Sequence, residues 1–244
     1  MPRYMIISCG VFYREVCHCI ATSKNVVDVI FRDIALHDLK STKMSNALQA
    51  TIDQIDHSRY DAILLGYGLC NNGVANLRAP IPIVMPRAHD CITVLLGSKK
   101  AYDKYFAENP GTYFKSSGWL ERDAGNKQDG ITKQLGTDKS YESWIEEYGE
   151  ENAEYLESIL GNWKLNYKKM TFINNGIGDI ENNRTATKAA AQEFGWEFEE
   201  VPGSPRLIEK LIAGDWNEDE FLVVPPNSKI VASYDAGVVI ASAH

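Results

Sequence analysis

Short apolar runs alternate with stretches of helical periodicity, and this alternation constrains the fold more than any other feature of the chain. Between the apolar runs Val26–Ile34 and Ala62–Leu65, three residues recur at helical spacing and predict an amphipathic helix: Met44, Leu48 and Ile52. The order strand, helix, strand is typical of a parallel sheet with right-handed crossovers. The strand-like runs of this first part are Tyr4–Ser8, Val26–Ile34, Ala62–Leu65 and Ile81–Met85.

The same order returns in the last third of the chain. Strands are predicted at Met170–Asn174, Trp196–Val201 and Phe221–Val224. An Ala-rich helix over Arg184–Phe194 and a helix that begins near Ser204 would connect them. We therefore predict an α/β protein with Rossmann-like parallel sheets in two similar lobes, although one continuous sheet would fit the same order.

The middle of the chain interrupts this alternation and sets the expected domain boundaries. Residues 98–165 are rich in Tyr, Trp, Glu and Lys and contain the turn-forming stretch RDAGNKQDGITKQLG. We expect residues 1–97 to form an N-terminal α/β lobe with a metal site, 98–165 a helical insertion or linker, and 166–244 a C-terminal α/β lobe. This segment contains aromatic residues, and we expect three of them to line a pocket: Tyr113, Phe114 and Trp119.

Charge and cysteine usage exclude several classes of function. The net charge of −8 and the absence of a basic block disfavour nucleic acid and anionic membranes as partners. No apolar run approaches the roughly 18 residues of a membrane helix, and a cytoplasmic protein is predicted. The 5 cysteines are an odd number and favour reduced thiols over a disulfide framework.

Soft metal ligands follow the predicted strands. Cys70 comes after the third strand, and His89 and Cys91 come after the fourth. Ligands gather at the carboxyl ends of parallel strands, and three protein ligands on zinc leave an open position typical of catalytic sites. Cys9, at the end of the first strand, is a candidate fourth ligand or a neighbouring thiol. The alternative is that these cysteines are ordinary core residues, because cysteine is among the most often buried residue types.

Two charged residues beside these ligands are candidate catalytic residues. Arg87 could bind a substrate carboxylate or phosphate, or could be an ordinary surface residue. Asp90 could accept a hydrogen bond from a ligand histidine, or could be a solvated loop charge. The turn Asn71-Asn72-Gly73 could line the pocket with amides, although a turn that needs positive φ explains it as well.

Two stretches of the chain read GYGLCNNGVANLRAPIPIVMPRAHDCITVLLGSKKAYDKYF and PGTYFKSSGWLERD. They resemble a bacterial and archaeal family of unknown function, whose members are often encoded beside corrinoid-dependent methyltransferases. The motif is a Cys-containing Gly-rich loop followed by Pro-Arg-x-His-Asp-Cys. It is matched here by Cys70, Pro86, Arg87, His89, Asp90 and Cys91.

The same ligands are similar in kind to those of zinc-dependent methyltransferases that move a methyl group from a corrinoid to a thiol. Those enzymes carry a His-x-Cys pair and a distant Cys, whereas here the lone Cys70 precedes His89 and Cys91. The chain is also too short for the barrel of those enzymes. The resemblance therefore suggests the chemistry of the metal site, whereas the fold is predicted from the sequence pattern alone.

Three functions fit these observations. The first is a zinc-dependent methyltransferase-type enzyme of one-carbon metabolism, in which the metal activates a thiol or another small nucleophile and a corrinoid is substrate or partner-borne. The second is a non-enzymatic metal- or corrinoid-binding accessory protein of a methyltransferase system. The third is a redox protein with an iron–sulfur cluster on Cys9, Cys70 and Cys91. An exposed apolar patch would favour the second, and a closed pocket would favour an enzyme.

Overall fold

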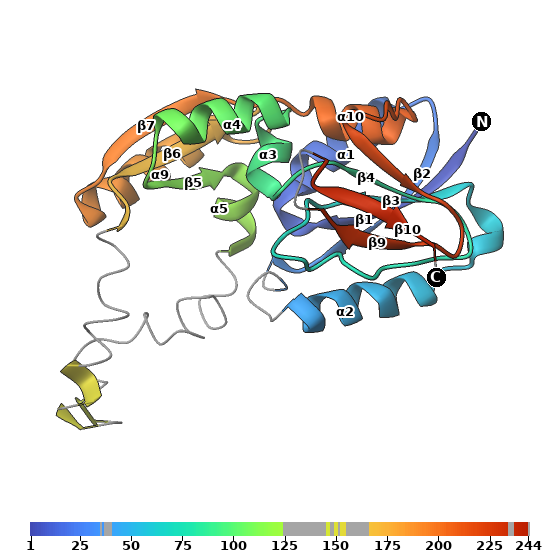
Figure 1. The fold of residues 1–244 in the computed structure, drawn as a ribbon. Coiled ribbons are helices and arrows are strands. Elements are labelled where there is room, and N and C mark those ends of the chain that lie inside the picture. The colour runs from blue at the N-terminus through green and yellow to red at the C-terminus, as the bar shows by residue number, and fades with distance from the viewer. Residues whose placement is uncertain are drawn as a thin grey trace.

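A computed structural model describes residues 1–34, 36, 41–123, 145–146, 149–150, 152–154, 166–233 and 237–243. It contains a five-stranded sheet, a three-stranded sheet and a two-stranded hairpin (Figure 1). The larger sheets are parallel apart from one edge strand. Helices connect β1 to β2, β2 to β3 and β6 to β7. The predicted α/β fold with Rossmann-like parallel sheets is confirmed.

The five-stranded sheet has the order β2-β1-β3-β4-β8. Its first four strands are parallel, and β8 pairs with β4 in the antiparallel direction. The near-continuous burial of β1, β3 and β4 identifies them as central strands that are covered on both faces. The strands are β1 (Arg3–Cys9), β2 (Val26–Arg32), β3 (Ala62–Gly66), β4 (Ile83–Pro86) and β8 (Phe221–Val224).

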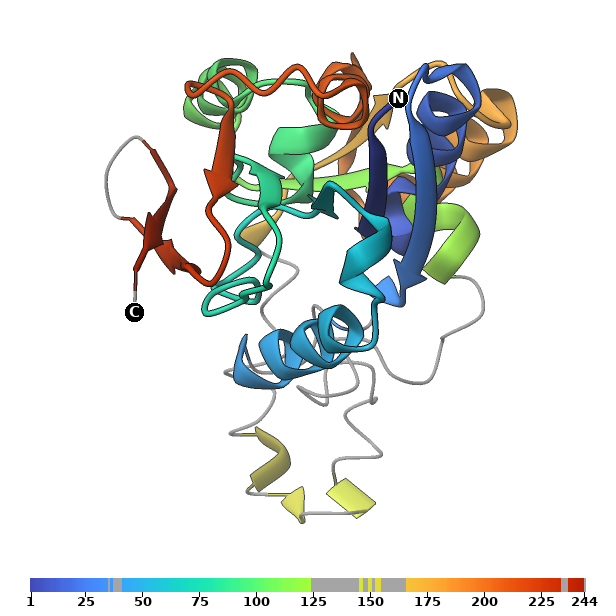
Figure 2. The same ribbon diagram turned by 90° about the vertical axis from the view of Figure 1, so that its right-hand side faces the viewer.

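Helices cover the two faces of this sheet (Figures 1 and 2). On one face α1 (Tyr13–Thr22) packs beside α10 (Arg206–Ala213), which buries Leu207, Ile208, Leu211 and Ile212 against the sheet. On the other face lies α2 (Ser41–Asp53), whose predicted apolar stripe is buried. The short helices of this part are η1 (Gly10–Phe12), η3 (His57–Arg59) and α3 (Cys91–Leu95).

The three-stranded sheet has the order β5-β6-β7 and is parallel throughout. Its strands are β5 (Thr112–Ser116), β6 (Lys169–Asn174) and β7 (Glu197–Pro202). One face meets α4 (Lys99–Glu108), where the Tyr105 hydroxyl lies 2.8 Å from that of Thr171. The other face meets α9 (Ile180–Phe194), where Arg184 pairs with Glu200. Because neighbouring residues of a strand point to opposite faces, Glu199 contacts α4 while Glu200 contacts α9.

The carboxyl ends of the two sheets face each other, with α3 and α5 (Ser117–Asp123) between them (Figure 1). A Cβ atom on Gly118, at the start of α5, would lie 1.7 Å from the carbonyl oxygen of Val11. After β7, the Ser204 amide donates to the carbonyl of Leu95 at the end of α3. The segments that leave β1 and β4 are therefore in direct contact with those that leave β5 and β7.

The division of the chain between the two sheets differs from the predicted boundaries. The expected insertion, 98–165, contributes β5 to the second sheet, and the rest of it lies largely outside the described residues. The expected C-terminal lobe contributes β8 to the first sheet, next to β4. It also forms the hairpin of β9 (Lys229–Ala232) and β10 (Val239–Ser242), which the sequence pattern did not predict. Strand pairing across more than a hundred residues leaves no local sequence signal.

An acidic residue at the start of β8 ties that strand to α10. Glu220 accepts hydrogen bonds from Asn217 Nδ2 at 2.8 Å and Lys210 Nζ at 3.0 Å, and it pairs with Arg206. Burial by itself would raise the pKa of Glu220, but the hydrogen bonds from these three side chains outweigh it and lower the pKa to about 2. Glu220 is therefore ionised in the folded protein over nearly the whole accessible pH range.

We predict that Glu220→Gln lowers the free energy of unfolding at neutral pH by about 1–3 kcal/mol, because the charge-assisted hydrogen bonds are lost. The folded pKa lies below the unfolded value of about 4.3, so the stabilisation is complete above that pH and disappears as the pH falls toward about 2. Urea unfolding of both proteins across this range tests the prediction. The control is Glu218→Gln, which changes an exposed neighbouring residue. If Glu220→Gln lost the same unfolding free energy at every pH value, the charge of Glu220 would not be the cause.

Candidate functional site

Three buried cysteines lie at the carboxyl edge of the five-stranded sheet. Cys9 is the last residue of β1, Cys70 lies in the loop after β3, and Cys91 is the first residue of α3, after β4. Their exposed fractions are 1%, 9% and 9%. A negative charge on Cys9 would raise the pKa of the Cys70 and Cys91 thiols, and a negative charge on Cys70 would raise the pKa of Cys91. The three thiols therefore lie close enough to interact electrostatically.

The place of these thiols in the sheet is one where ligands bind in other parallel α/β folds. The chain runs from β1 outward to β2 and then crosses back to β3 on the other side of β1. A reversal of strand order of this kind opens a crevice at the carboxyl ends of the two central strands. Cys9 ends the first of these strands, Cys70 lies in the loop after the second, and Cys91 follows the next strand.

The backbone that carries Cys70 is in an unusual conformation. Cys70, Asn71 and Asn72 have φ values of 48°, 53° and 65°, so three consecutive residues other than glycine adopt left-handed conformations. Asparagine tolerates this region, but a cysteine there carries a strain of order 1 kcal/mol. The alternative that this turn requires positive φ is confirmed, and it includes Cys70 itself. Strain of this kind persists where the surrounding structure holds it in place.

The loops after β3 and β4 hold each other in register. The amides of Leu69 and Cys70 donate to the carbonyls of Ala88 and His89 at 2.8 and 2.9 Å. A Cβ atom on Gly68 would lie 2.7 Å from the backbone of Asp90, so only glycine permits this approach. The two loops therefore extend the β3–β4 pairing beyond the sheet and fix the spacing of Cys70 and Cys91.

Backbone amides point at the sulfurs. The amide of Val11 lies against Cys9, and the amides of Gly68 and Cys91 lie against Cys70, where they lower the pKa of each thiol. Burial acts in the opposite direction and prevails, raising the pKa of Cys9 to about 12 and those of Cys70 and Cys91 further. Asp90 adds to this increase for both Cys70 and Cys91. The thiols are therefore neutral unless a cation joins them.

His89 does not lie with the cysteines, in contrast to the predicted Cys70–His89–Cys91 grouping. Its side chain is exposed and its ring faces Tyr102, with centroids 6.1 Å apart. Ala88 and Cys91 point inward on either side of it because the chain turns into α3 at Asp90. No group of three or more His, Cys, Asp or Glu side chains within the described ranges stands ready to hold a metal ion. Cys9 is the cysteine whose charge acts on both Cys70 and Cys91, and the predicted metal set stays a prediction.

The two predicted catalytic residues hold parts of the fold together. Asp90 caps α3, accepting from the Thr93 amide at 3.0 Å, and also accepts from the Tyr102 hydroxyl at 3.0 Å. Arg87 donates from Nε to the carbonyl of Glu218 at 2.8 Å and from Nη1 to the carbonyls of Gly237 and Val239. These contacts give Asp90 a role in starting α3 and Arg87 a role in fastening β10 beside β8. The predicted catalytic roles of Arg87 and Asp90 are neither supported nor contradicted by these contacts and stay predictions.

The aromatic residues expected to wall a pocket are dispersed. Tyr113 packs against Tyr167 and Trp196, whereas Phe114, its neighbour in β5, faces the other way toward α4. Trp119, on α5, packs against the main core. Alternation along β5 sends Tyr113 and Phe114 to opposite faces of the second sheet, so they do not line one cavity.

Tyr67 and Arg32 are the residues near the thiols that sequence analysis overlooked. Tyr67 is fully buried, and burial together with the charges of Cys9 and Cys70 raises the pKa of its hydroxyl, while Arg32 lowers it. Arg32 ends β2 and has a buried Nε without a hydrogen-bond partner among the described residues. The available signal was position, since each of the two stands at or just after the end of a strand. A phenol thus lies near Cys9 and Cys70, and Arg32, which stands beside Cys9 in the register of the sheet, acts on that phenol.

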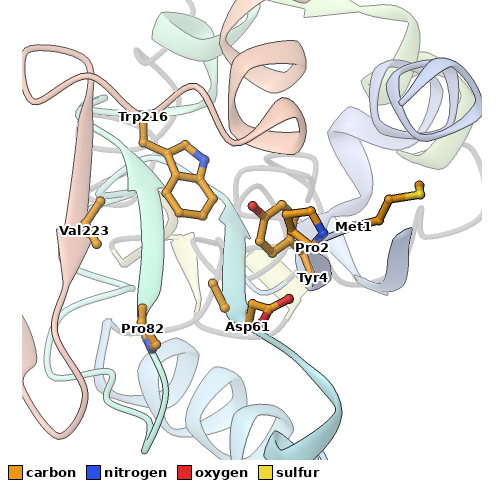
Figure 3. A pocket seen from close by; sticks show the side chains of 8 residues that line it. Met1, Pro2, Tyr4, Asp61, Pro82, Trp216 and Val223 are labelled. Carbon is orange, nitrogen blue, oxygen red and sulfur yellow. The ribbon is translucent and has the colours of Figure 1, made fainter. Parts of the chain in front are cut away.

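A hollow of about 470 Å³ lies at the opposite edge of the sheet (Figure 3). Tyr4 and Trp216 stand on its walls with ring centroids 5.4 Å apart, and Asp61 lies at its rim. The polar groups here already have partners: Trp216 Nε1 donates to Leu211 and Asp61 accepts from the Arg3 amide. This hollow is formed by the amino ends of the strands and is remote from the thiols.

We predict that one of the 5 cysteines reacts quickly with Ellman's reagent in the native protein, at mildly alkaline pH. Cys17 is the partly exposed thiol, whereas Cys19 is buried and burial raises its pKa to about 12. Cys17→Ser should abolish the fast phase, and all cysteines should react after unfolding in urea. A fast phase that survives in Cys17→Ser would show that the thiols at the sheet edge are accessible.

Comparisons with known proteins identify a family. Residues 31–212 match the model of a family described as Protein of unknown function (DUF1638). No curated protein and no solved structure matches the chain. Within the described residues, no helix is long and apolar enough to cross a membrane. The match spans most of the chain and includes Cys70, His89 and Cys91, and the chain therefore belongs to this family of unknown function.

Proposed function

We propose that this protein binds a soft transition metal, in the first instance zinc, through the thiolates of Cys9, Cys70 and Cys91. The observation that supports the proposal most is that three buried cysteines from three separate segments stand at the edge of the sheet where the strand order reverses. They also belong to the hydrophobic core. Here they share one edge with backbone amides directed at two of them.

The chemistry of the donor set fits such an ion. Soft thiolates prefer zinc, copper(I) and iron–sulfur centres over hard cations. A divalent ion would reverse the effect of burial on the thiol pKa values, because it stabilises each thiolate more than burial destabilises it. The nearby carboxylate of Asp90, which raises the pKa of Cys70 and Cys91, would then add favourable negative potential. Since the side chains do not stand at ligand geometry, binding requires rotation of cysteine side chains about χ1.

Three protein ligands would leave one coordination position for a substrate. Thiolate-bound zinc at such a position holds and activates a substrate thiolate, and we extend the proposal to a methyltransferase-type enzyme of one-carbon metabolism on this basis. The resemblance to zinc-dependent methyltransferases supports this extension, with Cys9 in place of the histidine of their ligand set. Arg32, near the thiols, is suited to an anionic group of the substrate. Binding of a corrinoid or of a corrinoid protein remains a prediction.

A second candidate function is a redox role with an iron–sulfur cluster. The all-cysteine set favours it, since iron–sulfur clusters are held by cysteine thiolates and a three-cysteine set leaves one iron for another ligand. The amides that point at Cys9 and Cys70 are also of the kind that tune cluster potentials. Metal identity separates the two candidates.

We predict about one zinc ion per chain in protein purified anaerobically without a histidine tag, measured by inductively coupled plasma mass spectrometry. Cys9→Ser, Cys70→Ser and Cys91→Ser should each reduce the metal content to below about a tenth, since each removes one of three ligands. Cobalt substitution should produce a thiolate charge-transfer band that is lost in the same variants.

Two variants serve as controls. Cys17→Ser leaves the site intact and should retain the metal. His89→Ala should also retain it, because the imidazole is exposed and turned toward Tyr102. Loss of metal in His89→Ala with retention in Cys9→Ser would instead support the Cys70–His89–Cys91 set. Iron with acid-labile sulfide would support the redox function, and a metal-free native protein would exclude both.

A further inference from the structure

A carboxyl group buried between the two sheets lacks a partner for one of its oxygens. Glu15 lies in the first turn of α1 and is 1% exposed. Its Oε1 accepts from Asn175 Nδ2 at 3.0 Å, and Asn175 follows the last residue of β6. Within the described part of the chain, Glu15 Oε2 and Asn175 Oδ1 are both buried and have no hydrogen-bond partner. The contact thus joins the first sheet's α1 to the carboxyl edge of the second sheet.

The two unpartnered atoms are both acceptors if Glu15 is ionised. A carboxylate oxygen and an amide oxygen cannot satisfy each other, and each buried acceptor without a partner costs about 1–3 kcal/mol. Rotating the amide does not help, because it only exchanges which carboxylate oxygen receives the N–H. A proton on Oε2 would satisfy both atoms at once, since a protonated carboxyl donates one hydrogen bond.

The surroundings hold the amide in place and supply no charge that would keep Glu15 ionised. A Cβ atom on Gly203 would lie 1.8 Å from Asn175 Oδ1, so this glycine leaves the space that the amide oxygen fills. The titratable groups that act on Glu15 are Glu121 of α5 and Arg14 of α1, which form an ion pair at 2.8 Å, so their effects on Glu15 oppose each other. Cys19, one turn along α1, is neutral because burial raises its pKa. Burial is the largest influence on Glu15 and raises its pKa.

We propose that Glu15 is a neutral carboxylic acid at physiological pH and that it forms a two-hydrogen-bond ring with the amide of Asn175, which latches the carboxyl edges of the two sheets together. Asn175 Nδ2 donates to Glu15 Oε1, and the proton on Glu15 Oε2 is donated to Asn175 Oδ1. Ionisation removes that proton, leaves two acceptors facing the same buried space and loosens the latch. The inference is independent of metal binding.

Direct titration of Glu15 tests the protonation state. In protein labelled with ¹³C at glutamate Cδ, the resonance that disappears in Glu15→Gln is followed from acid to alkaline pH. We expect it to titrate well above the value of about 4.3 of exposed glutamates. Titration near that value would mean an ionised Glu15 that meets a buried water, and would overturn the proposal.

The stability of Glu15→Gln tests the ring, because the glutamine amide can form the same pair of hydrogen bonds without a titratable proton. The folded pKa of Glu15 lies above the unfolded value, so the wild type is at its most stable relative to the variant at acid pH. Above about pH 4.3 its unfolding equilibrium constant should rise tenfold per pH unit relative to Glu15→Gln, until the folded pKa is reached. Glu209→Gln, an exposed site on α10, is the matched control and should show no such trend.

Hydrogen exchange tests the latch separately from the titration. One pH unit above the measured pKa, amides of residues 10–16 and 116–118 should exchange at least about tenfold faster in the wild type than in Glu15→Gln. At acid pH the two proteins should exchange equally. Equal exchange at both pH values would show that Glu15 carries a proton without holding the sheets together, and would refute the latch.

Discussion

The contact between the loops that leave β3 and β4 is the constraint on which the candidate site depends. Gly68 lets the first loop lie directly on the backbone of Asp90, and two amide–carbonyl hydrogen bonds hold the loops side by side. In this arrangement Cys70 has a left-handed conformation, and the charge of Cys9 acts on Cys70 and Cys91. A side chain at Gly68 would separate the loops and with them the sulfurs.

Burial without charge compensation is the common property of the groups at this junction. Cys9, Cys70, Cys91 and Glu15 are all groups whose ionised forms burial disfavours. Elsewhere the protein pairs its charges, as Glu220 does with Arg206 and Lys210. At the junction of the two sheets these acids have no charged partner to offset their burial. Binding of a cation, or loss or gain of a proton, therefore changes the local electrostatics strongly there.

Most of the strands could be predicted because their burial is visible locally. The apolar runs of β1, β3, β4 and β6 are continuous, as expected of central parallel strands. In contrast, β5 (TYFKS) is only partly buried and mixes aromatic with polar residues, so its local pattern does not indicate a strand of the sheet. The position of β8 depends on pairing with the distant strand β4, which local patterns do not encode, whereas β9 and β10 pair with each other.

The candidate site divides in the same way. Residue order alone established that thiols and an imidazole follow strands of a parallel sheet, and hence at which edge of the sheet these candidate residues lie. It did not establish orientation: whether His89 or Cys9 joins Cys70 depends on the turn at Asp90 and on β1 lying beside β3. The pairing of Glu15 with Asn175 likewise exists only where two sheets meet. Periodicity and spacing are local properties that a sequence displays, whereas the meeting of side chains from distant strands is set by packing.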